Sequence, residues 1–178
     1  MNNSVEFHIG VQADFRMNKY CAVLCRISSL SESDASLFES RIDDEYKVNM
    51  ILDNLPVGMV RLKQDHGKEI KTYERGFPVG YMDESGKAFL NNHLHFTILY
   101  HRDSVTDLAR IVGFEVEPYS VAHTYEGSWP SDKTTPKLKT CDADGERFIT
   151  GKETKLQVDQ GKEVVFTYDV VFKPSNIQ

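Results

Sequence analysis

The 178-residue sequence lacks the short motifs that mark several common classes of enzyme. No Gly-x-Ser-x-Gly elbow is present, and Gly151-Lys152 has neither the upstream glycine nor the following Ser or Thr of a phosphate-binding loop. Asp142-Ala-Asp-Gly145 resembles the start of a calcium loop, but the remaining ligands of that loop are out of register. We therefore expect neither an enzyme nor a bound cofactor.

Long apolar runs and basic clusters are missing as well. No apolar run reaches 18 residues, so the sequence predicts no transmembrane helix. Lys and Arg are scattered along the chain, and the net charge is −6. This distribution argues against a nucleic acid or an anionic membrane surface as the partner of the chain.

Cysteine is scarce: the three cysteines are Cys21, Cys25 and Cys141. If residues 21–25 form a strand, four residues cover about 13 Å, whereas a disulfide needs Cα atoms within about 7 Å. Cys21 then cannot bridge Cys25, while Cys141 could bridge either one and leave the other without a mate. Three reduced thiols, as in a cytosolic protein, are the alternative.

What the sequence contains is a globular composition with many aromatic residues. Hydrophobic residues make up 40% and charged residues 27%, and ten Phe and eight Tyr favour β structure. This length fits one domain, residues 1–178, which needs neither metal nor disulfide to fold.

Apolar residues alternate with polar ones along most of the chain, as in half-buried strands. The segments expected as strands are 5–15, 21–27, 48–52, 59–63, 70–74, 94–100, 111–117 continuing through 119–123, 148–150, 156–158 and 164–172. One helix is expected around residues 33–46, capped by Ser31 or Ser33. The pattern predicts an antiparallel β-sandwich of about nine strands with one inserted helix.

Three histidines lie on one face of the strand expected at 94–100. His93 and His95 are close enough to share a metal ion with a third ligand, whereas His101 lies about 26 Å from His93 along a straight strand. Polar residues on a solvent-facing side of the strand are the simpler interpretation. The same applies to Glu115 and Glu117, which could imitate a carboxylate pair but are expected to face solvent.

Several segments, taken in order, resemble the N-terminal luminal domain of the nonaspanins, the transmembrane nine superfamily, and are closest to its plant-type members. The resembling segments are Cys21–Cys25, Arg41–Pro56 with Asp53-Asn54-Leu55-Pro56 at its end, Gly76-Phe77-Pro-Val-Gly80, Asn92-His93-Leu94, Arg110–Pro118 with Gly113-Phe114-Glu115, Thr140–Asp142, Phe166–Val170 and Ser175–Ile177. Together they cover nearly the whole chain.

The resemblance implies a luminal, non-catalytic domain that precedes nine membrane spans. Nonaspanins reside in Golgi and endosomal membranes and are implicated in sorting and surface delivery of other membrane proteins. Membrane-protein clients and the protein's own membrane-spanning region are then the expected partners, with the loop at 125–140 as the main contact surface. The family's opening segment carries a further cysteine, which would be the mate of the thiol that Cys141 leaves unpaired.

The resemblance attaches no catalytic residue to this domain, and the residues of the resembling segments are expected to be structural. A metal- or sugar-binding β domain, possibly enzymatic, that uses His93 and His95 is the alternative from the residues alone.

Overall fold

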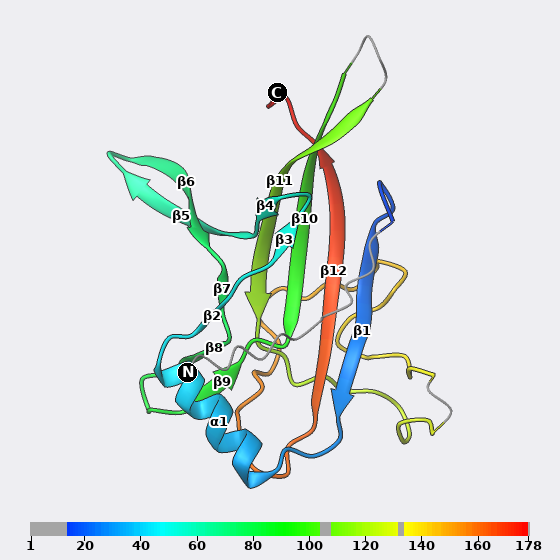
Figure 1. The fold of residues 1–178 in the computed structure, drawn as a ribbon. Coiled ribbons are helices and arrows are strands. Elements are labelled where there is room, and N and C mark those ends of the chain that lie inside the picture. Colours follow the sequence, from blue (N-terminus) through cyan, green and yellow to red (C-terminus); the bar gives the residue numbers. More distant parts are fainter. Residues whose placement is uncertain (1–13, 104–107, 132–133, 178) are drawn as a thin grey trace.

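A six-stranded mixed sheet carries the fold in the computed structural model, which describes residues 14–103, 108–131 and 134–177. Its strand order is β1-β12-β10-β11-β5-β6 (Figure 1). Three two-stranded sheets, β2-β7, β3-β4 and β8-β9, accompany it. The elements are β1 (Lys19–Ile27), α1 (Glu32–Asp43), β2 (Lys47–Val48), β3 (Ile51–Leu52), β4 (Leu55–Pro56), β5 (Gly58–Asp65), β6 (Lys68–Arg75), β7 (Phe77–Pro78), β8 (Gly80–Met82), β9 (Ala88–Leu90), β10 (His93–Arg102), β11 (Ala109–Tyr119) and β12 (Val164–Pro174).

The prediction of a mainly β chain with one helix is confirmed, but the antiparallel sandwich is not what the structure shows. β10 pairs with β12 in parallel, and β11 pairs with β5 in parallel. The reason is topological, because β12, the last strand of the chain, lies between β1 and β10, and β5 pairs with β11, a strand that comes much later in the sequence. Alternation shows which residues share a face, but it does not give the order or direction of strands.

The centre of the sheet is buried because its alternating apolar residues meet on one face. Phe96 and Ile98 of β10, Val116 of β11 and Val170 of β12 are at most 3% exposed and belong to one core cluster. Phe77 joins them from β7. The predicted strands at 94–100, 111–117 and 164–172 therefore lie where expected.

Helix α1 begins where the sequence predicts and ends slightly earlier. The Ser31 hydroxyl accepts a hydrogen bond from the backbone N–H of Asp34 and so caps the first turn. Ala35 and Ile42 bury the inner face against the β8-β9 hairpin. Gly80 is required at this contact, since a Cβ there would lie 2.1 Å from the Phe89 carbonyl oxygen.

The β5-β6 hairpin forms as predicted, and most of its length projects from the rest of the sheet. His66 and Gly67 have positive φ values of 47° and 78°, as in the type I′ turns that suit two-residue hairpin loops. Only Gly58 and Met59 of β5 pair with β11, and the rest of the hairpin projects away from it (Figure 1).

We call residues 120–158 the loop layer. Strands were expected at 119–123, 148–150 and 156–158, but β11 ends at Tyr119 and the other two segments form no strand. Isolated bridges Phe89–Gln157 and Tyr125–Leu138 take their place. Val121, Leu138 and Ile149 are buried in a cluster with Cys21 of β1. The loop layer thus covers one end of the sheet. The strand expected at 5–15 lies mostly outside the described residues.

Candidate functional site

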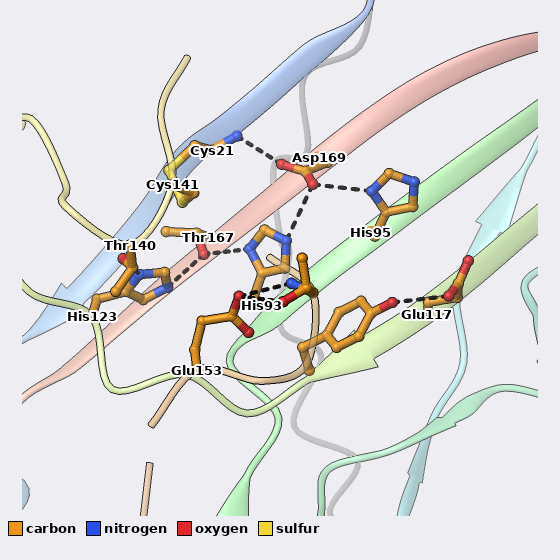
Figure 2. Close-up of polar contacts among 12 residues, drawn as sticks. Cys21, His93, His95, Glu117, His123, Thr140, Cys141, Glu153, Thr167 and Asp169 are labelled. Carbon is orange, nitrogen blue, oxygen red and sulfur yellow. Dashed lines mark hydrogen bonds and ion pairs between the residues drawn. A yellow bond between two sulfur atoms is a disulfide. The ribbon is translucent and has the colours of Figure 1, made fainter. Parts of the chain in front are cut away.

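The largest concentration of buried polar groups lies between the loop layer and the central strands (Figure 2). We call it the polar network. Its members are His93 and His95 of β10, Thr167 and Asp169 of β12, and His123 and Thr140 of the loop layer.

Asp169 is the main acceptor of the polar network and is 3% exposed. One carboxylate oxygen accepts the backbone N–H of Cys21 at 2.7 Å, and the other lies 3.3 Å from His93 Nε2 and 3.0 Å from His95 Nδ1. Burial by itself raises the pKa of Asp169, but the hydrogen bonds from His93, His95 and the Cys21 N–H outweigh burial and hold the pKa well below its usual range. Asp169 is therefore a carboxylate at neutral pH.

The Thr167 hydroxyl joins two imidazoles. Thr167 Oγ1 lies 2.8 Å from His93 Nδ1 and 2.8 Å from His123 Nε2, while His123 Nδ1 lies 2.6 Å from Thr140 Oγ1. With Asp169 ionised, one assignment satisfies every bond: His93 Nε2–H donates to Asp169, Thr167 O–H to His93, His123 Nε2–H to Thr167, and Thr140 O–H to His123. In this assignment each of the two imidazoles donates through Nε2 and accepts through Nδ1.

His123 is a second member of the polar network whose pKa is shifted by its surroundings. Its pKa is lowered from 6.5 to about 4, first by burial and then by the neighbouring His93, while the charge of Glu153 acts in the opposite direction. Tyr119 lies beside His93, with ring centroids 6.1 Å apart, and burial together with the hydrogen bond to Glu117 raises its pKa to about 12.

A disulfide closes the polar network into a ring. Cys21, whose N–H binds Asp169, is bonded to Cys141, which follows Thr140 directly in the chain. Both half-cystines are buried, and the bond joins edge strand β1 to the loop layer. Of the pairings that the sequence leaves open, the structure has Cys21–Cys141. Cys25 is exposed with a free thiol, and partial burial of its sulfur raises its pKa.

The histidine and glutamate predictions need correction. His93 is fully buried and does not face solvent, because the loop layer covers this part of β10. His95 is partly exposed, and His101 lies away from the polar network, with Nδ1 3.2 Å from the Ser175 carbonyl oxygen. Within the described ranges, no three His, Cys, Asp or Glu side chains are grouped as ligands of a metal ion.

Glu115 is 8% exposed, so the expectation that it faces solvent is wrong. Lys71 donates to both of its carboxylate oxygens, at 2.8 and 2.9 Å, and the Tyr73 hydroxyl donates at 2.8 Å. Both donors are on β6 and reach Glu115 of β11 across β5. Tyr73 packs over Gly58, where a Cβ would lie 3.4 Å from its ring. Glu117 remains exposed and accepts the Tyr119 hydroxyl.

Asn92 lies directly before β10, and both the nitrogen and the oxygen of its side-chain amide make hydrogen bonds. Its amide donates to the carbonyl oxygens of Val121 and Val165, each at 2.8 Å, and its oxygen accepts the N–H of Val121 at 2.8 Å. The side chain therefore fastens the loop layer to the start of β12. Leu94 and Phe114 pack against the central core cluster beside Phe77.

The remaining motif residues occupy turns and close backbone contacts. Asp53 and Asn54 have positive φ values of 48° and 64° in the turn between β3 and β4, and Leu55 and Pro56 form β4 itself. Gly76 has a φ of 72°, and a Cβ there would lie 2.6 Å from the Val48 carbonyl oxygen.

Gly113 faces Leu99 beside the register shift in the β10-β11 pair. A Cβ at Gly113 would lie 2.9 Å from the Leu99 side chain, so the bulged strand pair depends on the absence of a side chain at this point.

Sequence reasoning missed Thr140, Thr167, Asp169 and His123 as members of the polar network. The available signal was Thr167 and Asp169 themselves, two polar residues on one face of an otherwise apolar strand. Glu153 was missed too, and its Oε2 is buried without a hydrogen-bond partner, while Oε1 accepts from Thr150.

The fold and the polar network define a mainly β chain in which the members of the polar network bind one another and the loop layer is tied to the sheet by a disulfide. No helix among the described residues is long and apolar enough to cross a membrane. The sequence profile of "Endomembrane protein 70" matches residues 5–178, and the chain belongs to this family.

The relatives include two proteins of Arabidopsis thaliana. "Transmembrane 9 superfamily member 8" is 46% identical over 168 residues, with 92% of this chain and 25% of the relative covered. "Transmembrane 9 superfamily member 9" is 46% identical over 170 residues, with 92% and 26% covered. "Putative phagocytic receptor 1a" of Dictyostelium discoideum is 33% identical over 156 residues, with 83% and 22% covered.

The chain thus spans about a quarter of the length of these curated relatives. No solved structure matches it.

Proposed function

We propose that residues 1–178 form the luminal, non-catalytic domain of a nine-span Golgi or endosomal membrane protein that takes part in sorting and surface delivery of other membrane proteins. Family membership supports the membrane-protein context. A relative with the name "Putative phagocytic receptor 1a" is compatible with a role in which this domain meets other macromolecules. Its contacts would be made with client membrane proteins and with the membrane-spanning region of the same protein.

The observation that carries the non-catalytic part is the internal satisfaction of the polar network. A nucleophile, base or metal ligand needs a free lone pair or proton directed at a substrate. Here Asp169 has three donors, and Thr167 and His123 each contact partners on both sides. His93 is fully buried, so a substrate could reach it only if the loop layer opened.

The disulfide supports the luminal part of the proposal. Disulfides persist in oxidising compartments such as the secretory lumen and are rare in the cytosol. Cys21 and Cys141 are separated by 120 residues and lie in the core between β1 and the loop layer, as expected of a structural disulfide.

A glycosylation test in the full-length parent examines the luminal location. His66→Asn/Lys68→Thr creates an Asn-Gly-Thr acceptor in the exposed turn of the β5-β6 hairpin, a position whose backbone suits Asn-Gly. We expect a glycosidase-sensitive gain in mass for this variant. His66→Asn alone creates no glycosylation acceptor at this turn and is the matched control. The native Asn2-Asn-Ser4 triplet is present in both variants, so it does not contribute to a difference in mass between them.

A double variant that reaches the membrane and remains unmodified would contradict the luminal location. Client contact is examined separately by photocrosslinking from Trp129 of the loop layer, which packs on Tyr125 and on Arg26 of β1. Crosslinks to other membrane proteins are expected, and their absence in cells that sort such cargo would contradict the sorting role.

No observation favours a metal- or sugar-binding function based on His93 and His95. Both imidazoles already bind Asp169, and His93 has no access to solvent. A metal ion would have to displace these bonds.

A further inference from the structure

Exposed apolar side chains gather at the end of the sheet opposite the disulfide. We call this the open end, and it comprises residues 14–17, 100–103, 108–110 and 172–177. Phe15, Met17, Leu108 and Ile177 are 48, 64, 71 and 63% exposed. The other exposed large apolar side chains are spread over the rest of the described chain, from Leu37 to Phe148.

The strand pairing brings these residues together although they are far apart in sequence. Tyr100 pairs with Pro174, and its carbonyl oxygen accepts the N–H of Ser175 at 2.8 Å. Phe15 packs edge-on against Tyr100 and Phe172, with ring centroids 5.9 and 5.6 Å away. The segment that precedes β1 is thereby fixed beside the end of β12.

Aromatic and basic groups accompany the apolar ones. The Arg16 guanidinium lies over the Tyr100 ring at 5.1 Å and over the Phe15 ring at 5.5 Å. Arg110 and Lys173 are exposed on the adjoining strand ends. Among the described residues of the open end, the charged side chains are the cations Arg16, Arg102, Arg110 and Lys173 and the carboxylates Asp14 and Asp103, on a chain whose net charge is −6.

The chain reaches Ile177 at this same end, beside the outer ends of β10 and β11 (Figure 1). The relatives are about four times as long and are transmembrane proteins by name. If membrane spans follow Gln178, as the proposed function has it, the open end is the part of the domain nearest the bilayer.

We propose that the open end docks on the membrane, with Met17, Leu108 and Ile177 in the lipid headgroup region and Arg16, Arg110 and Lys173 on lipid phosphates. Aromatic and basic side chains beside apolar ones are the composition that bilayer interfaces favour. The net negative charge of the whole chain argues against an anionic surface, but charge at the point of contact decides docking, because salt screens more distant charges. The inference rests on the proposed orientation of the chain towards the membrane.

Vesicle sedimentation of the 178-residue chain tests this surface. Vesicles of phosphatidylcholine and phosphatidylserine at 7:3, and of phosphatidylcholine alone, are the probes. Met17→Asp/Leu108→Asp places two negative charges at the open end. It should lower the fraction of protein bound at least fivefold on both types of vesicle. Ile51→Asp/Leu62→Asp is the matched control, because these residues are 70 and 64% exposed, lie elsewhere and receive the same two charges. It should bind like the unaltered chain.

Arg16→Gln/Lys173→Gln should weaken binding to the 7:3 vesicles about fivefold per residue removed, with a smaller effect on phosphatidylcholine. The proposal is overturned if the unaltered chain does not sediment with either vesicle, or if both aspartate doubles lose binding equally. It is also overturned if a photocrosslinker at Leu108 in the full-length parent captures protein and no lipid. The glycosylation test would stand in each of these cases, since it depends only on which side of the membrane the hairpin occupies.

Discussion

The two ends of strand β10 have the same kind of sequence and opposite surroundings. At its start, His93 is fully buried, while at its end Tyr100 and His101 are partly exposed beside the exposed Phe15 and Leu108. Each end carries a histidine next to an apolar residue, His93 before Leu94 and His101 after Tyr100. The difference comes from the loop layer, which covers the first end with the Val121, Leu138 and Ile149 cluster and is fixed there by a disulfide.

Covering one end changes what polar residues must do. A buried polar group that lacks a partner is costly, so the residues under the loop layer bind one another. At the open end water satisfies polar groups, and apolar and cationic side chains can remain available for a partner. We therefore expect substitutions at the covered end to act on stability and substitutions at the open end to act on binding.

The largest effect is expected from removing the disulfide. Cys21→Ala/Cys141→Ala opens a loop of 120 residues and should lower the free energy of unfolding by about 4 kcal/mol, measured by urea denaturation without reductant. Cys25→Ala is the control and should change it by less than about 0.5 kcal/mol, because Cys25 is exposed and unpaired. Equal losses in the two variants would mean that the bond does not hold the covered end.

Two neighbouring asparagines give the next contrast. Asn92→Ala removes three hydrogen bonds to buried backbone groups of Val121 and Val165 and should cost about 3 kcal/mol. Asn91→Ala removes a single, partly buried bond to the Pro78 carbonyl oxygen and should cost about 1 kcal/mol. Thermal and urea unfolding would measure both, and a larger loss for Asn91→Ala would show that the loop layer is held by other contacts.

The third effect depends on pH. The pKa of His123 is about 4 in the folded chain, below 6.5, so the unfolded chain takes up this proton first as pH falls. The stabilisation is complete above pH 6.5 and is lost as pH falls towards 4, by about 3 kcal/mol in all. Asp169, whose pKa is also depressed, adds a loss at still lower pH.

His123→Gln should flatten the fall between pH 6.5 and 4.5, as measured by urea unfolding at several pH values. Parallel curves for the variant and the unaltered chain would exclude His123 as the cause.

The smallest effect is expected at the open end. Met17→Asp and Leu108→Asp replace exposed side chains and should each change the free energy of unfolding by less than about 0.5 kcal/mol. A melting temperature several degrees lower would show that these residues are part of the core, and the comparison between the two ends would fail.

Local patterns were sufficient for the helix and the long strands, but not for the short strands β2, β3, β4, β7, β8 and β9. Ser31 marks the helix start, and the alternation at 94–100 and 164–172 gives β10 and β12. Strand order and direction could not be predicted, because pairing depends on contacts between distant segments. The parallel β10-β12 pair is an example.

The same limit applies to the candidate site. Alternation correctly places His93 and His95 on one face of β10, but it cannot show that the loop layer covers that face at His93. Glu115 was assigned to solvent for a similar reason, since its partners Lys71 and Tyr73 are more than 40 residues away in sequence. In both cases the burial was decided by a segment remote in the chain.

Peptide mapping of the full-length parent, alkylated in intact membranes before lysis and digested without reduction, is the most direct test of the covered end. The structure predicts a cross-linked peptide that contains Cys21 and Cys141. Alkylation of both cysteines, or a bond from Cys141 to Cys25, would contradict both the closed polar network and the assignment of this domain to an oxidising lumen.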